Sequence, residues 1–111
     1  MAIDTTNVKI LGAIDPELIR KVIRENASQV RYCYEQELTL NPKLEGKVAI
    51  QWQIGPDGRA SGCSLHSDTT LLNEKVQRCI MSRIVTWQFP KPKGGGIAIV
   101  KYPWILRTSG G

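Results

Sequence analysis

The chain of 111 residues has the length of one ordinary domain, and its 41% hydrophobic content is enough for one modest core. Fifteen Lys and Arg residues against ten Asp and Glu residues leave a net charge of +5, which favours anionic partners without identifying one. No stretch approaches the roughly 20 apolar residues that cross a bilayer, and no helix-turn-helix, zinc or aromatic RNA-binding pattern accompanies the charge, so nucleic acid is not an expected partner.

The first predicted elements are a short strand and a long helix. Val8 and Ile10 begin an apolar segment, and Asp15-Pro16-Glu17 then supplies an N-cap, a first-turn proline and an acid near the positive helix end. From Ile19 to Leu38, apolar residues recur at intervals of three and four. This spacing predicts an amphipathic helix whose apolar stripe faces a core.

The predicted helix runs to about Leu40, where Asn41-Pro42 stops it. Unbroken, it would have about 24 residues and a length of about 36 Å. Asn26 and Ser28 allow a kink in it.

A β-hairpin is predicted next. The turn Gly55-Pro56-Asp57-Gly58 joins two strands, of which the first alternates strictly between apolar and polar residues. Its inward residues are Val48, Ile50, Trp52 and Ile54. In the second strand Cys63 and Leu65 share one parity and are expected to point inward.

A second helix and a last strand complete the pattern. The cluster Ser67-Asp68-Thr69-Thr70 is interpreted as helix capping, with Thr70 as the N-cap of a helix that ends near Trp87. Phe89-Pro90-Lys91-Pro92 and three glycines then lead to a strand over residues 97–106. Because Pro103 has no N–H to donate to a neighbouring strand, the later half of that strand is expected at a sheet edge or a bulge.

Together these elements predict an α+β fold, a small antiparallel sheet of three to four strands with two helices packed on one face. We expect residues 1–111 to form a single domain. The bare end Ser109-Gly110-Gly111 and the lack of any leader indicate a domain excised from a longer protein.

The sequence offers little for catalysis. His66 is the only histidine, and its place near a strand end favours a surface or turn role. The glycines fit turns, since no Gly-rich loop with a lysine leads into a helix. No catalytic residues, no cofactor and no metal site are therefore predicted, and the chain is not expected to be an enzyme.

The three cysteines leave one question open. Cys33 and Cys79 lie on the inward stripes of two helices that cover the same sheet face, where they could form a disulfide or remain two buried thiols. Cys63 is interpreted as a small core residue. The cysteines lack the CxxC or histidine spacing of a metal site.

The ordered set of motifs resembles a known family. Gly46-Lys47-Val48, the turn to Arg59, the helix and the Phe89-Pro90-Lys91-Pro92 segment look like the TonB C-terminal domain pattern over about 60 residues. With Cys33-Tyr34-Glu35, Cys79 and Tyr102-Pro103-Trp104, the chain is similar to the AgmX/PglI C-terminal domain of myxobacterial gliding-motility proteins.

This resemblance implies a periplasmic module at the end of an inner-membrane-anchored protein, which transmits force to periplasmic or outer-membrane components. In that oxidising compartment it favours a disulfide between Cys33 and Cys79, with Cys63 left as a free, buried thiol. It also implies β-augmentation, in which an extended partner segment adds beside the last strand. The implied partner-binding edge consists of Ile97, Ala98, Ile99, Val100, Lys101 and Tyr102.

Alternatives to this interpretation stay open. The N-terminal strand near Val8-Ile10 could cover the edge, or Lys101 and Pro103 could merely guard it against aggregation. The domain could instead be a structural spacer, a self-association module or homodimer, or a binder of an anionic polymer.

Overall fold

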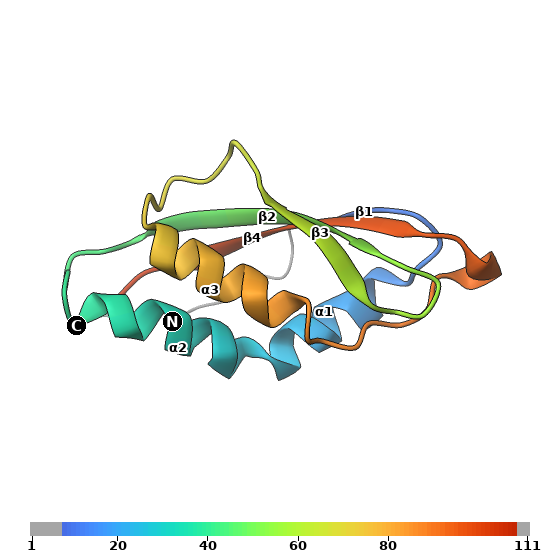
Figure 1. The fold of residues 1–111 in the computed structure, drawn as a ribbon, viewed down its shortest axis with the longest axis horizontal. Helices are drawn as coiled ribbons and strands as arrows, with labels where there is room; N and C mark the ends of the chain where they lie inside the picture. The colour runs from blue at the N-terminus through green and yellow to red at the C-terminus, as the bar shows by residue number, and fades with distance from the viewer. Residues whose placement is uncertain (1–7, 109–111) are drawn as a thin grey trace.

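A computed structural model describes residues 8–108 of the chain. In this range four antiparallel strands form one sheet, and three α-helices cover one of its faces (Figure 1). The α+β fold predicted from the sequence is confirmed. Of the predicted single domain 1–111, residues 1–7 and 109–111 lie outside the described part. None of the helices within 8–108 is long and apolar enough to cross a membrane.

The strands lie in the order β1-β4-β2-β3. They are β1 (Lys9–Leu11), β2 (Gly46–Ile54), β3 (Ala60–Leu65) and β4 (Ala98–Leu106). β2 and β4 pair over nine consecutive positions, from Gly46 opposite Leu106 to Ile54 opposite Ala98, and form the centre of the sheet. A 3₁₀ turn, η1 (Lys93–Gly95), precedes β4.

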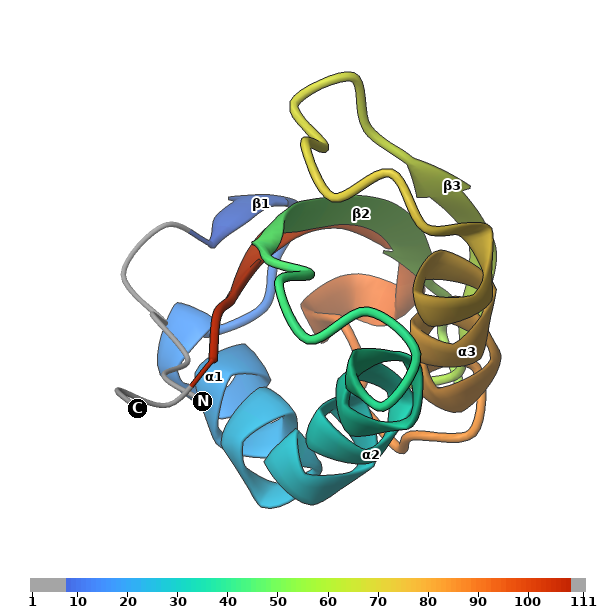
Figure 2. The same cartoon turned by 90° about the vertical axis from the view of Figure 1, so that its left-hand side faces the viewer.

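The long predicted helix is two helices, α1 (Pro16–Glu25) and α2 (Ala27–Leu38), which meet at an angle at Asn26 (Figure 2). The predicted start is confirmed, because the Asp15 carboxylate accepts the Glu17 N–H at 2.9 Å. At Asn26 the backbone leaves the helical region, and the Asn26 side-chain amide donates to the Val22 carbonyl at 2.8 Å. The asparagine side chain thus competes with the helical hydrogen-bond ladder, and the allowed kink becomes a break.

The inward faces of β2 and β4 build the core. The predicted inward residues of β2 are all buried, and Trp52 stacks on Trp104 of β4 with ring centroids 6.1 Å apart. Tyr102 meets the edge of Trp104 at 4.7 Å, and Phe89 lies 5.8 Å from Trp52. Such aromatic pairs stabilise a core beyond the area that they bury. The core therefore lies directly beneath β4.

The second arm of the hairpin differs from the prediction in how deeply it is buried. Leu65 lies opposite Ile50 in the register, so it shares the inward direction, yet 40% of it is exposed. Cys63 is half-buried and not fully buried as predicted. Both residues lie on an edge strand that has no neighbour on its outer side within residues 8–108, and a bulge at Gly62 bends this strand away from the flat sheet.

The third helix, α3 (Glu74–Ile84), begins later than predicted. Its N-cap is Asn73, whose side chain accepts the Val76 N–H at 3.0 Å. Thr70 is not the cap, because its hydroxyl accepts the Lys47 N–H at 2.8 Å and its own N–H donates to the Lys47 carbonyl. The interpretation of residues 67–70 as helix capping was therefore wrong: these residues continue the pairing along β2.

A disulfide joins α2 to α3. Cys33 and Cys79 are bonded, with their Cα atoms 5.6 Å apart, so the pairing that the resemblance implied is confirmed. Cys33 is buried, whereas Cys79 is partly exposed. Cys63 is a free thiol, and its burial raises its pKa, which makes it a poor nucleophile at neutral pH.

Candidate functional site

The predicted partner-binding segment, Ile97 to Tyr102, forms the first half of β4. Ala98, Val100 and Tyr102 point inward and are buried, whereas Ile99 and Lys101 point to the sheet face that lacks helices. Ile97 precedes the strand and is 54% exposed. β2 occupies one side of this segment, so a partner strand could add only on the other side, which we call the outer edge of β4.

The outer edge of β4 is not free over its whole length. β1 pairs with it over three positions, placing Lys9 opposite Lys101, Ile10 opposite Val100 and Leu11 opposite Ile99. Whether this edge is free or covered by an N-terminal strand was left open by the sequence, and the structure has the cover strand at these three positions (Figure 2). Within residues 8–108, no strand pairs with the outer edge over positions 103–106.

β1 is a poorly matched neighbour for β4. It has three residues, and Leu11 is 72% exposed. Ile10 alone packs against the core, and it is only half-buried. Lys9 and Lys101 stand directly opposite each other, and like charges in that position destabilise strand pairing. Few interactions therefore hold β1 in place, and the repulsion between Lys9 and Lys101 opposes its pairing with β4.

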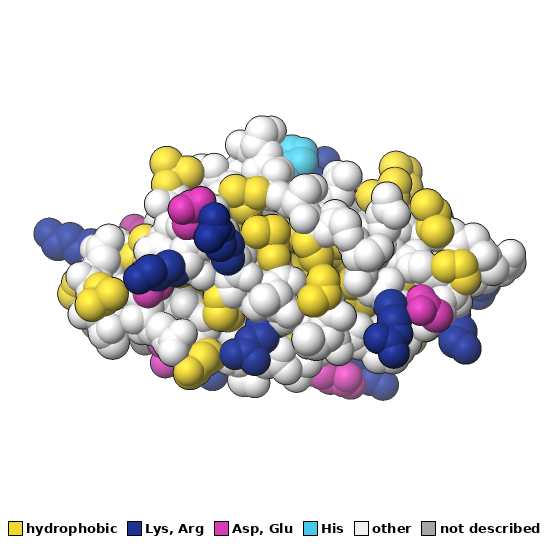
Figure 3. Space-filling model, viewed as in Figure 1, with side chains coloured by type: hydrophobic (Ala, Val, Ile, Leu, Met, Phe, Trp, Pro, Cys, Tyr) yellow, Lys and Arg dark blue, Asp and Glu magenta, His cyan; other side chains and the backbone are white. Residues whose placement is uncertain are grey.

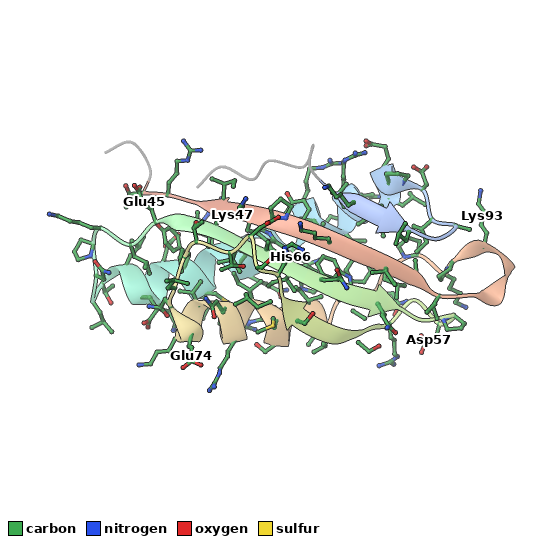
Figure 4. All side chains as sticks on the ribbon, turned by 90° about the horizontal axis from the view of Figure 1, so that it is seen from above. Glu45, Lys47, Asp57, His66, Glu74 and Lys93 are labelled. Carbon is green, nitrogen blue, oxygen red and sulfur yellow. A yellow bond between two sulfur atoms is a disulfide. The ribbon has the colours of Figure 1, made fainter. Side chains whose placement is uncertain are left out.

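A hollow of about 250 Å³ opens on the sheet face beside this edge. We call it the lysine hollow and define it by its lining residues, Lys9, Lys47, Asp68, Lys101, Pro103 and Ile105. Figure 4 looks onto this face, with Lys47 and His66 labelled on it. Pro103 and Ile105 provide an apolar floor, and three ammonium groups against one carboxylate leave an excess of positive charge.

Asp68 lines the hollow from the segment of residues 66–70, which is hydrogen-bonded along β2. His66 donates its N–H to the Ala49 carbonyl at 2.8 Å, and the Thr69 hydroxyl accepts the Ala49 N–H at 3.0 Å. These bonds bring Asp68 across the sheet to Lys101, whose Nζ lies 2.6 Å from Asp68 Oδ2. The hydrogen bond from Lys101 is the main cause of the lowered pKa of Asp68.

His66 has a structural part in this segment. Its Nδ1 accepts the Asp68 N–H at 3.1 Å. The same Nδ1 lies 3.5 Å from Asp68 Oδ2, so the imidazole holds the segment of residues 66–68 in a tight turn. Among residues 8–108, no group of three His, Cys, Asp or Glu side chains is placed to hold a metal ion.

The opposite sheet edge is the second candidate surface. In the view of Figure 3, apolar side chains gather along the middle of the molecule, where α3 and β3 lie, and charged side chains flank them. Leu65 of β3 and Leu72 before α3 are 40% and 85% exposed. The bulge in β3, with Gly62 at φ 63°, makes this edge irregular and less suited to strand addition than the regular β4.

Sequence reasoning missed the lysine hollow. The parity of β2 and β4 was sufficient to place Lys47 and Lys101 on the same sheet face. Asp68 carried no such signal, because its approach to Lys101 depends on hydrogen bonds between residues about 20 positions apart.

Comparison with known proteins identifies the fold. The chain is similar to the solution NMR structure of the Helicobacter pylori TonB C-terminal domain, residues 179–285, with a TM-score of 0.59 and 21% sequence identity. The alignment covers 88% of this chain and 87% of that one. No family model matches the chain, and no curated protein matches it. The chain therefore has a fold like that of a TonB C-terminal domain.

Proposed function

We propose that this chain is a non-catalytic protein-interaction domain that binds an extended segment of another protein by strand addition to β4. The observation that carries this proposal is the weak cover on the outer edge of β4. A regular strand whose outer edge is held by three residues offers backbone N–H and carbonyl groups to a competing strand.

In this proposal the partner segment takes the place of β1. It pairs with the backbone from Ile97 to Tyr102 and continues along positions 103–106, where it gains pairing that β1 does not make. Pro103 has no N–H, so the partner carbonyl next to it is left to water. The longer pairing offsets the cost of releasing Ile10 from its half-buried place.

The setting that we propose is the periplasm, with the domain attached to an inner-membrane-anchored protein. The disulfide between Cys33 and Cys79 supports an oxidising compartment, because such bonds are rare in reducing ones. The resemblance to the AgmX/PglI C-terminal domain makes a force-transducing gliding-motility complex the proposed assembly. Its partner would be a periplasmic or outer-membrane protein of the same machinery.

The proposal is tested by adding extended segments of candidate envelope proteins to the isotopically labelled domain and following its backbone amides. Strand addition predicts shifts along β4 and the loss of cross-strand contacts from β1. Shifts confined to the surfaces of α1 and α2, with residues 97–102 unchanged, would contradict it.

Lys9 provides a graded control of the cover strand. Lys9→Gln removes the repulsion with Lys101, and Lys9→Glu replaces it with an attraction, a total change of about 1 kcal/mol. Because the partner must displace β1, the affinity for the partner should be about fivefold lower in Lys9→Glu than in the unchanged protein. The affinity of Lys9→Gln should lie between these two values. Equal affinities for all three forms would show that β1 does not compete for this edge.

Self-association is a second candidate, favoured by the exposed Leu65 and Leu72 at the edge where β3 lies. A homodimer through this edge would bury both side chains. Sedimentation at increasing concentration distinguishes the two candidates, since Leu72→Ser should abolish a dimer and leave strand addition at β4 unchanged.

A further inference from the structure

We infer that the lysine hollow selects partner segments with acidic side chains at alternate positions, so that the strand accepted by β4 is both extended and acidic. This inference rests on the proposed strand addition and assigns the chemistry of the partner. It is carried by Lys101 of β4 and Lys47 of β2, which line the hollow on the open sheet face and stay there when a partner displaces β1.

The pleat of the sheet determines which partner side chains reach the hollow. Side chains of successive residues point to opposite faces, so those on the hollow side lie opposite Lys101, Pro103 and Ile105. The partner residue opposite Lys101 would stand where Lys9 now stands. An acid at that position exchanges a repulsive pair for an attractive one.

Further along β4, the hollow-side residues of the partner face Lys47 across that strand. In the register of the two central strands Lys47 of β2 lies opposite Ile105, so β4 separates it from the outer edge and its side chain lines the hollow from the inner side of β4. Within residues 8–108 neither Lys9 nor Lys47 forms an ion pair, whereas Lys101 does. Lys47 acts on Asp68 only at longer range, as the weakest of the charges that lower its pKa, so an incoming carboxylate can pair with Lys47 without breaking a close ion pair.

The other face of the partner strand must be apolar. Ile10 of β1 fills the inward position opposite Val100 and packs against the core. A segment that displaces β1 must cover the same core surface. The partner chemistry that fits both faces is an alternation of apolar and acidic residues.

Asp68 competes with the partner for Lys101. Its carboxylate lies 2.6 Å from Lys101 Nζ, and the Lys101 side chain is only 18% exposed. Removing this internal anion frees Lys101 and adds one positive charge to the hollow. Asp68→Asn should therefore raise the affinity for an acidic segment. A variant that failed to fold would lose affinity, so a gain cannot come from misfolding.

Two capped synthetic peptides test the inference. The acidic peptide alternates valine and glutamate over five positions with a serine at each end, and the neutral peptide has glutamine in place of each glutamate. Binding to the intact domain is measured by fluorescence anisotropy, and labelled backbone amides of β4 and side-chain signals of Lys47 and Lys101 report where each peptide lies. Lys75→Gln, on α3 and away from the hollow, is the charge-matched control for Lys47→Gln, and Glu35→Gln is the control for Asp68→Asn.

We expect the acidic peptide to bind about fivefold more tightly per glutamate than the neutral one, with the difference decreasing at high salt. Lys47→Gln should lower the affinity for the acidic peptide about fivefold, and Asp68→Asn should raise it about fivefold. The two control variants should change this affinity little.

The readouts separate this inference from the proposed function. If both peptides shift the β4 amides and bind equally, strand addition stands and acid selection is overturned. If neither peptide binds at millimolar concentration, both are overturned. If soluble polyphosphate binds as tightly as the acidic peptide and the lysine signals shift without β4, the hollow serves an anionic polymer and this inference is overturned.

Discussion

Removing the disulfide between Cys33 and Cys79 should cost a large part of the stability that a domain of this size has. The two cysteines are 46 positions apart, and closing a loop of that length in the unfolded chain stabilises the fold by about 4 kcal/mol. Domains of this size are stable by about 5–15 kcal/mol. The double variant Cys33→Ala/Cys79→Ala should therefore unfold at a midpoint roughly 15 °C lower, with a comparable loss in urea.

The assay is urea unfolding of the double variant, of Cys63→Ala and of the unchanged protein, followed by tryptophan fluorescence. Cys63→Ala is the matched control, because this half-buried thiol closes no loop and its loss should cost about 1 kcal/mol or less. Thiol counting in denaturant without reductant should find one free thiol in the unchanged protein. Three free thiols, or a loss of less than 1 kcal/mol in the double variant, would refute the reasoning.

Three further predictions concern single residues. Gly58→Ala should destabilise by more than 2 kcal/mol in urea, because a Cβ there would overlap the Phe89 carbonyl oxygen, whereas Gly94→Ala, at nearly the same φ of 80° but in open space, should cost about 1 kcal/mol. Tyr34→Phe should cost about 1 kcal/mol by removing the hydrogen bond from its hydroxyl to the Leu44 carbonyl, and absorbance titration should show a raised pKa for Tyr34, chiefly because burial disfavours the charged form. The lowered pKa of Asp68 means that its contribution to stability is complete above the ordinary value of 3.8 and is lost as pH falls through the lower folded value; an acid titration of Asp68→Asn should lack this component, and identical pH profiles would contradict it.

The parts of the fold that could be predicted are those determined by local pattern. The alternation in β2 identified its inward residues, the Asp15-Pro16 cap identified the start of α1, and Asn26 was recognised as a place where the helix could bend. Each of these depends on interactions within a few residues. Local pattern was therefore sufficient for most of the core and for the fold class.

The parts that could not be predicted depend on contacts between distant segments. Thr69 and Thr70 resemble helix caps locally, yet their hydroxyls bond to β2 about 20 residues earlier in the chain. The pairing of β1 with β4 joins segments about 90 residues apart, and no local turn motif predicts it. The lysine hollow follows from both contacts together, so its composition needed the structure.

In the function that we propose, a weakly held cover strand would reconcile protection of the β4 edge with its use for binding. An exposed regular strand invites aggregation, and even three residues of β1 block part of it. The cover reduces the affinity of every competing strand by the fraction of time that the edge is open. A short apolar segment would gain too little to overcome this cost, whereas an acidic strand also relieves the repulsion between Lys9 and Lys101. If the proposal holds, the repulsion between Lys9 and Lys101 that makes β1 a poor neighbour would also favour an acidic strand in its place.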